Sequence, residues 1–208
     1  MDYKKILDHK NGDYHNEVMT ESDFILLKQL VSDTGYLEFI ENNNGGFFYK
    51  NSIHIYSITL TPYFNSFFRV NEVIKKEYIN ILDNEIFFGQ ELFGNQFGFS
   101  SNGIIFFNIE TGERTIIGKT FSDWIDVIDS DIEYYSGINV MEAWVQLNGK
   151  LNNEQRLCPK IPFIVGGNYE IENLYSQPFP DYITSNANIA NQIYGLPDGT
   201  PIRLKIDN

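Results

Sequence analysis

The sequence has few of the residues on which disulfide-stabilised domains, metal sites and many enzymes depend. Its single cysteine, Cys158, excludes an internal disulfide and any site with several cysteine ligands. It contains three histidines, no Asn-x-Ser/Thr sequon, and no Walker A, Gly-x-Gly-x-x-Gly or Gly-x-Ser-x-Gly motif. It shows neither an apolar run of signal-peptide length near its start nor a continuous membrane span. We therefore expect a soluble, cytoplasmic protein.

Basic residues are also scarce, since 15 Lys and Arg stand against 28 Asp and Glu and leave a net charge of −13. Nucleic-acid backbones and anionic membranes would repel such a chain, which argues against both as partners. A basic partner, or simply solubility, explains the charge. The 208 residues include 17 Phe and 13 Tyr, enough to fill the core of one domain of ordinary size.

Hydrophobic periodicity and turn residues predict an α+β fold in which runs of strands are followed by helices. The predicted helices are 24–31, 36–41, one that Asn71 caps, one that Thr120 caps and Gly137 ends, 139–147 and 181–193. The predicted strands are 47–50, 53–58, 86–88, 96–100, 103–109, 114–119, 163–165, 173–175 and 202–206, of which 86–119 form an antiparallel meander. We divide the chain into an N-terminal segment (1–19), a core (20–147) and a C-terminal extension (148–208) packed on the core, with a linker at 148–160.

Three segments resemble the SUKH superfamily, which includes bacterial immunity proteins and a fungal cell-wall-synthesis regulator. They are GYLEFIENNNGG (35–46), FGFSSNGIIFFNIETGE (97–113) and FSDWIDVI (121–128). Two features depart from the family: Thr34-Gly35 stands where many members have Leu-Pro, and the extension from Pro159 resembles only the longer members. The resemblance implies a strongly bent, mostly antiparallel sheet with helices packed around it. It also implies a non-enzymatic protein that binds and neutralises a cognate toxin.

Candidate catalytic and metal-binding residues are few. His9 and His15 lack the i, i+4 spacing that zinc sites on helices often use. His54 lies on the same face of a predicted strand as Tyr56, which favours a half-buried structural histidine. The thiol of Cys158 is interpreted as inert or buried, although a Cys–His pair assembled by the fold is the alternative.

Two further patterns admit a chemical interpretation. Gly166-Gly167 follows an apolar segment, and a tight turn explains the pair better than a phosphate site does. Glu110 and Glu113 flank a turn, where two carboxylates facing one substrate would suit a glycosidase. A solvated hairpin tip is the favoured explanation of these two acids.

The helix after Thr120 carries the most suggestive surface. Asp123, Asp126, Asp129 and Glu133 recur every three or four residues with no basic residue between them, so they stack along one face. A solvated helix face is one interpretation, and a docking stripe for a cationic partner is the other. Aromatic anchors for such a partner are Tyr134 and Tyr135, and also Tyr56 and Phe48 if one face of the sheet stays open; core packing is the alternative for all four.

These observations lead to a functional hypothesis with two alternatives. The leading hypothesis is an immunity protein that occludes the surface of a basic toxin domain such as a nuclease, without catalytic residues, metal, cofactor or small-molecule substrate. The alternatives are an intracellular scaffold or regulatory interaction domain and, with less support, a hydrolase that uses acidic residues.

Overall fold

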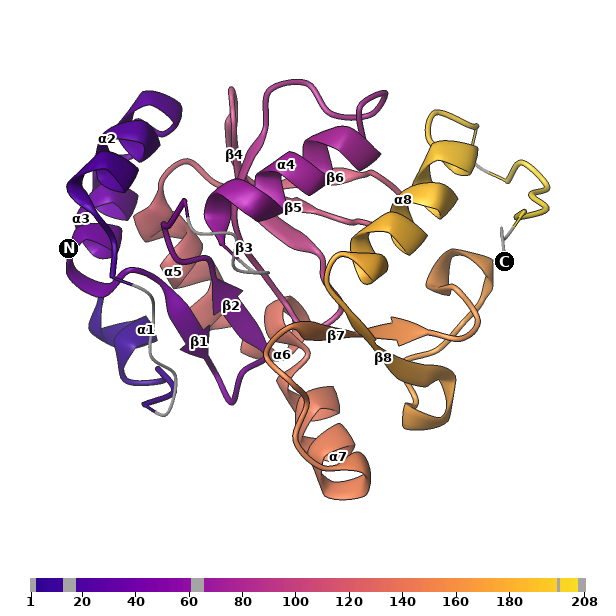
Figure 1. The fold of residues 1–208 in the computed structure, drawn as a ribbon. Coiled ribbons are helices and arrows are strands. Elements are labelled where there is room, and N and C mark those ends of the chain that lie inside the picture. Colours follow the sequence, from indigo (N-terminus) through magenta and orange to yellow (C-terminus); the bar gives the residue numbers. More distant parts are fainter. Residues whose placement is uncertain (1–2, 13–17, 61–65, 198, 206–208) are drawn as a thin grey trace.

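The computed structural model describes residues 3–12, 18–60, 66–197 and 199–205. Its centre is a six-stranded sheet in which every strand pairs antiparallel with the next one along the chain (Figure 1). The strands are β1 (Gly46–Phe48), β2 (Ile53–Ile55), β3 (Ile86–Gln90), β4 (Gln96–Ser100), β5 (Gly103–Phe107) and β6 (Arg114–Gly118). The predicted α+β class and the antiparallel meander are both confirmed.

The turns of the meander follow from short polar side chains and one glycine. In the β4–β5 turn, Gly103 has φ +125°, and a Cβ at this position would lie 2.4 Å from the carbonyl oxygen of Gly118 on β6. Between β5 and β6, the Asn108 side chain accepts hydrogen bonds from the backbone N–H groups of Glu110 and Thr111. These local bonds close the hairpins and hold the strands in register.

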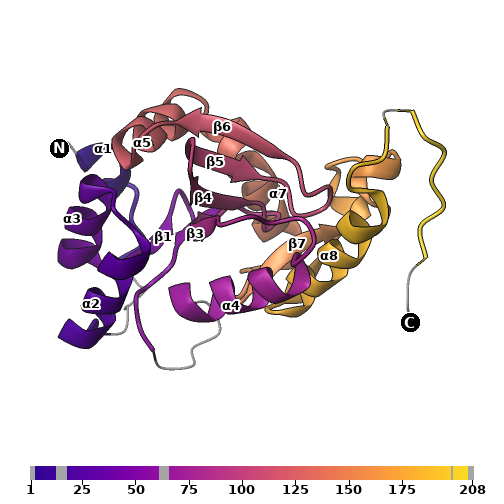
Figure 2. The same ribbon diagram turned by 90° about the horizontal axis from the view of Figure 1, so that it is seen from above.

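Helices cover both faces of the sheet, as Figure 2 shows from above. Neighbouring residues of β3 lie on opposite faces of the sheet. Phe87 packs with Phe107 on the face that α4 covers, and Phe88 packs against Trp124 on the face that α5 covers. The helices around the sheet are α2 (Glu21–Leu30), α3 (Thr34–Asn43), α4 (Phe67–Glu77) and α5 (Phe121–Ser130). The Asp33 carboxylate accepts from the N–H of Tyr36 in α3 and from that of Phe121 in α5, so one side chain caps both helices.

The described part of the N-terminal segment belongs to the core fold. Helix α1 (Lys4–Leu7) buries Ile6 in the main hydrophobic cluster. Lys10 forms an isolated antiparallel β-bridge with Phe48 of β1. The N–H of Asn11 donates to the carbonyl oxygen of Phe47, and the N–H of Tyr49 donates to the carbonyl oxygen of His9. Residues 9–11 therefore cover the outer edge of β1.

The C-terminal half adds a second, two-stranded sheet and packs it on the core. Its elements are α6 (Ile132–Ser136), α7 (Ile138–Asn148), β7 (Gln155–Pro159), the 3-10 turns η1 (Phe163–Val165) and η2 (Ile171–Asn173), β8 (Leu174–Pro178) and α8 (Asp181–Ile193). Helix α8 lies beside α4 and places Tyr182, Ile183, Ala187 and Ala190 in the main cluster. None of the described helices combines the length and apolar character needed to cross a membrane.

Four predictions about elements outside 120–137 were wrong. The expected linker 148–160 contains β7, and 163–165 forms a 3-10 turn rather than a strand. Residues 202–205 lie in no strand, and Ile206 falls outside the described residues. Asn71 does not cap a helix, because Ser66 caps α4 and the Asn71 amide instead bonds the backbone N–H and C=O of Phe87.

Candidate functional site

The predicted acidic stripe begins with a structural residue. Thr120 is the N-cap of α5, and the Asp123 carboxylate returns to accept hydrogen bonds from the N–H groups of Lys119 and Thr120, at 2.9 and 3.0 Å. These bonds lower the pKa of Asp123, because they stabilise the ionised carboxyl group. Asp123 therefore completes a capping box, and its oxygens are engaged at the start of the helix.

The next two acids face outward and share a cation. Lys5 of α1 forms ion pairs with Asp126 at 2.8 Å and with Asp129 at 3.5 Å, and the two carboxylates remain 64% and 44% exposed. The stripe thus has a basic counterpart that lies 121 residues away from Asp126 in the sequence. Periodicity within one helix carries no information about such a partner, so sequence reasoning missed Lys5.

The stripe does not continue as one helix. Asp131 has φ −146° and ψ 66°, which ends α5, and its side chain then accepts from the N–H of Tyr134 to start α6. Glu133 is exposed on this separate short helix. The prediction of a single helix from Thr120 to Gly137 was therefore wrong, although Gly137 does end α6.

Tyr134 and Tyr135, the two predicted anchors on α6, differ in exposure. The Tyr134 ring is 68% exposed, whereas Tyr135 is half-buried with its ring centroid 5.8 Å from that of Phe106 on β5. The two rings are perpendicular, 4.9 Å apart. Tyr134 is consequently available to a partner, and Tyr135 packs against both Tyr134 and Phe106 of the sheet.

Tyr56 and Phe48 do not lie on an open face. Both are fully buried, and the Tyr56 hydroxyl donates to Oε1 of Gln96. His54 is also fully buried rather than half-buried, stacked on Phe47 with ring centroids 4.1 Å apart. Tyr56 is therefore removed from the candidate surface, because Arg156 of β7 and Tyr182 of α8, both in the C-terminal extension, lie close to it.

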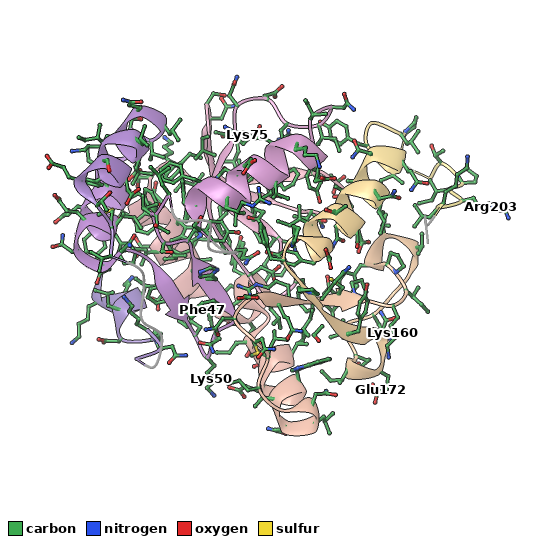
Figure 3. All side chains as sticks on the ribbon, viewed as in Figure 1. Phe47, Lys50, Lys75, Lys160, Glu172 and Arg203 are labelled. Atoms are coloured by element: carbon green, nitrogen blue, oxygen red, sulfur yellow. The ribbon has the colours of Figure 1, made fainter. Side chains whose placement is uncertain are left out.

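A groove of about 690 Å³ lies beside Asp129. Its other walls are the N-terminal residues 8–12, the β1–β2 turn at 49–51, and Ile132 and Ile138. The His9 and Tyr49 rings stack across it at 4.4 Å, and Lys50, which Figure 3 shows projecting from the turn, pairs with Glu142 of α7. We define the acidic surface as Asp126, Asp129 and Glu133, together with Tyr134 and this groove.

Three consecutive residues of the groove wall have a rare backbone conformation. Tyr49, Lys50 and Asn51 have φ values of 49°, 57° and 73°, in the left-handed region that residues with a Cβ seldom adopt. Strain of this kind persists where the surroundings fix the conformation, here through the His9 stack and the Tyr49 N–H bond. The turn thus presents a rigid wall to whatever enters the groove.

The remaining chemical candidates are occupied by structural roles. Glu110 is buried rather than solvated, and its carboxylate accepts from the N–H groups of Phe163 and Ile164, while Glu113 is exposed. Burial raises the pKa of Glu110 and raises that of the Cys158 thiol to about 12, the opposite of an activated nucleophile. His15 lies outside the described residues, and within them no three His, Cys, Asp or Glu side chains are grouped to hold a metal ion.

A buried ionisable cluster joins the sheet to the extension, and sequence reasoning missed it. Arg156 of β7 is buried against the Gln90 side chain. With the Gln90 amide oriented to satisfy both neighbours, its oxygen lies 3.2 and 3.0 Å from Nε and Nη2 of Arg156 and its nitrogen donates to the Tyr182 hydroxyl. Next to Gln90, the buried Glu91 carboxylate accepts from the N–H groups of Phe93 and Asn95. Sequence reasoning missed the cluster because Arg156 stands in 148–160, which was expected to be a linker, and only the pairing of β7 with β8 buries it.

Glu91 and His54 make opposite contributions to the pH dependence of stability. Burial raises the pKa of Glu91 to about 8, although the two N–H donors and Arg156 favour the carboxylate. Between pH 4.5 and about 8 the folded protein holds a proton that the unfolded chain has lost, so stability falls as pH rises through this window. Burial lowers the pKa of His54 well below 6.5, so its contribution is lost as pH falls below 6.5.

We therefore expect the free energy of unfolding to decline from pH 6.5 to pH 8, by up to about 1.4 kcal/mol per pH unit. Glu91→Gln should flatten this decline, because the amide has no proton to lose. Urea unfolding at pH 6.5, 7.2 and 8 measures both slopes, with Glu113→Gln as the matched loss of an exposed acid. A wild-type slope of zero in this window would mean that Glu91 is ionised in the folded protein.

The fold and the site together describe an α+β protein with an antiparallel meander, helices on both sheet faces and an acidic surface at one end. No protein-family model matches the chain, and no curated protein is similar to it. Among solved structures, the crystal structure of Atu4351 from Agrobacterium tumefaciens is similar, with a TM-score of 0.64 over 88% of this chain and 86% of that chain. The sequences are 15% identical, so this likeness shows a shared fold alone.

Proposed function

We propose that the chain is a cytoplasmic immunity protein of the SUKH type, which binds a basic bacterial toxin domain and neutralises it by covering its surface. The observation that carries the proposal is the acidic surface: exposed carboxylates at the end of α5 and on α6 adjoin an exposed tyrosine and a rigid-walled groove. The net charge of −13 makes the whole molecule negative, like this surface. Binding of this kind needs no catalytic residue, metal or cofactor.

The physical basis is the charge that a nuclease toxin must carry. A domain that cuts nucleic acid binds a polyanion and is therefore basic. An acidic inhibitor is drawn to such a domain before contact, which raises the association rate at low salt. Exposed aromatic rings then supply the desolvated contacts that hold the complex together.

The segments that resemble SUKH proteins support the family assignment by their packing. Residues 35–46 form most of α3 and enter β1, 97–113 form the β4–β5 hairpin and the next turn, and 121–128 begin α5. They meet at Tyr36, whose ring centroid is 5.3 Å from that of Phe99 and 5.3 Å from that of Phe121. The three segments thus make one continuous part of the core.

The alternative is an intracellular scaffold or regulatory interaction domain, for which the same surface would serve an endogenous partner. A hydrolase has less support, because Glu110 and Cys158 are engaged in packing the extension. Co-expression with a toxin gene encoded beside this one separates the first two functions. Survival no better than with an empty vector contradicts immunity, and recovery of an endogenous complex favours the scaffold.

Charge reversal tests the surface itself. Asp126→Lys with Asp129→Lys should slow association with the toxin about tenfold or more at low salt and flatten its salt dependence, measured by stopped flow. Both positions are exposed and exposed ion pairs add little stability, so the thermal unfolding curve should move little.

The matched control is Glu170→Lys with Glu172→Lys, which makes the same change in net charge on the extension. Both residues are exposed, and Figure 3 shows Glu172 well away from α5. If the two double variants slow association equally, the effect comes from net charge and the interface lies elsewhere.

A further inference from the structure

The two edges of the six-stranded sheet differ. Residues 9–11 cover β1, whereas no backbone group of another described segment bonds to the outer side of β6. Thr115 and Ile116, in the middle of β6, are both exposed, and Ile116 keeps 58% of its surface. An open edge with an exposed β-branched side chain is a template for another strand.

The hydrogen-bond alternation of the ladder identifies which groups are free. The N–H of Asn108 donates to the carbonyl oxygen of Glu113, so Glu113 faces β5. In an antiparallel pair the facing residues alternate, so Thr115 also faces β5, while the backbone groups of Arg114 and Ile116 point outward. The register shift after Ile105 ends this regular pattern towards Gly118.

We propose that β6 pairs antiparallel with β6 of a second copy of this chain. With Thr115 opposite Thr115 of the other copy, the outward groups of Arg114 meet those of Ile116 in two symmetric pairs, each able to exchange both N–H···O=C bonds. The two Ile116 side chains become diagonal neighbours on one face, and Thr115 faces its own copy on the other.

Charge complementarity supports a second copy as the occupant. In an antiparallel self-pairing, Glu113 just before the strand lies at the same end of the pair as Lys119 just after the strand in the other copy. Both side chains are exposed, and residues 114–122 contain no acid in an otherwise acidic protein. Self-pairing goes beyond the proposed toxin binding and does not depend on it.

Sedimentation velocity at about 0.15 M salt, where repulsion between the acidic copies is screened, tests the proposal. Between about 1 µM and about 1 mM protein the wild type should pass from monomer to dimer. Ile116→Pro removes an outward N–H without touching the β5–β6 bonds and should weaken the dimer at least about tenfold, while Ile116→Val, which keeps the N–H, should not.

A charge swap tests the register and does not depend on the folding of the proline variant. Glu113→Lys alone and Lys119→Glu alone should each weaken the dimer, because like charges then meet across the pair. The double swap restores opposite charges and should recover the wild-type dissociation constant. A wild type that stays monomeric at about 1 mM overturns the proposal, and so does a dimer that all these variants leave unchanged.

Discussion

Replacing Trp124 with alanine should lower the free energy of unfolding by about 3–5 kcal/mol. The ring is fully buried in α5, with its centroid 5.1–5.3 Å from those of Phe88, Phe97 and Phe121. No side chain nearby is free to fill the vacated volume, because its neighbours are themselves packed rings. For a chain of this length the midpoint of thermal unfolding should fall by roughly 6–20 °C.

Two further variants show whether packing volume is the cause. No protein atom among the described residues accepts a hydrogen bond from Trp124 Nε1, so Trp124→Phe loses volume but no bond and should cost clearly less than alanine. Leu147→Ala removes an exposed side chain from α7 and should change stability by about 0.5 kcal/mol or less. A midpoint unmoved by Trp124→Ala would mean that α5 turns a different face to the sheet.

At pH 7, Arg156→Ala should also be destabilising, by about 2–6 kcal/mol, at about 1–3 kcal/mol for each of the two buried acceptors that lose their donor. The buried guanidinium bonds the Gln155 carbonyl oxygen at 2.6 Å and the Gln90 side chain, and its charge faces Glu91. Removing it leaves the Gln155 and Gln90 oxygens without this donor, and above the pKa of Glu91, about 8, it also leaves a buried carboxylate without a cation. Because Arg156 lies in β7, the loss should also loosen the extension, visible as faster amide exchange in β7 and β8 than in β4 and β5.

The double variant Glu91→Gln/Arg156→Met separates charge from packing. Above the pKa of Glu91, part of the cost of Arg156→Ala comes from an uncompensated buried carboxylate, so removing both charges and filling the space should recover much of the stability lost there. Equal losses in the single and double variants would assign the effect to the hydrogen bonds of Arg156 alone. Equilibrium urea unfolding at about pH 9, where Glu91 is ionised in the folded wild type, measures all three proteins, and the same series at pH 7 is the control in which Glu91 holds its proton.

Local sequence signals predicted the elements that local chemistry determines. Thr20 and Thr120 each close a capping box, and the turn at Ser101–Gly103 forms its hairpin. Strand β7 was missed because its partner β8 lies across two 3-10 turns, and nothing within 155–159 reveals that pairing. The apolar composition of 163–165 predicted a strand, but these residues form a turn. The N–H groups of Phe163 and Ile164 donate to the carboxylate of Glu110, which lies 53 residues before Phe163.

The candidate surface was likewise predictable only where residues close in sequence determine it. Spacing located Asp126 and Asp129 on an exposed helix face, and adjacency suggested Tyr134. It did not reveal the helix break at Asp131, where the aspartate side chain competes for backbone N–H groups, or the approach of Lys5. Tyr56 was misplaced because burial of the sheet depends on how the C-terminal extension folds back, which no local pattern records.

The strip of chain at residues 9–11 has a consequence for assembly. It covers the edge of the six-stranded sheet at β1, so another strand can pair with this sheet only at β6. Symmetric pairing at β6 then occupies the remaining edge of the sheet in both molecules. Association of this kind terminates at a closed pair and cannot propagate into a filament, which lets an unprotected strand persist in a concentrated solution.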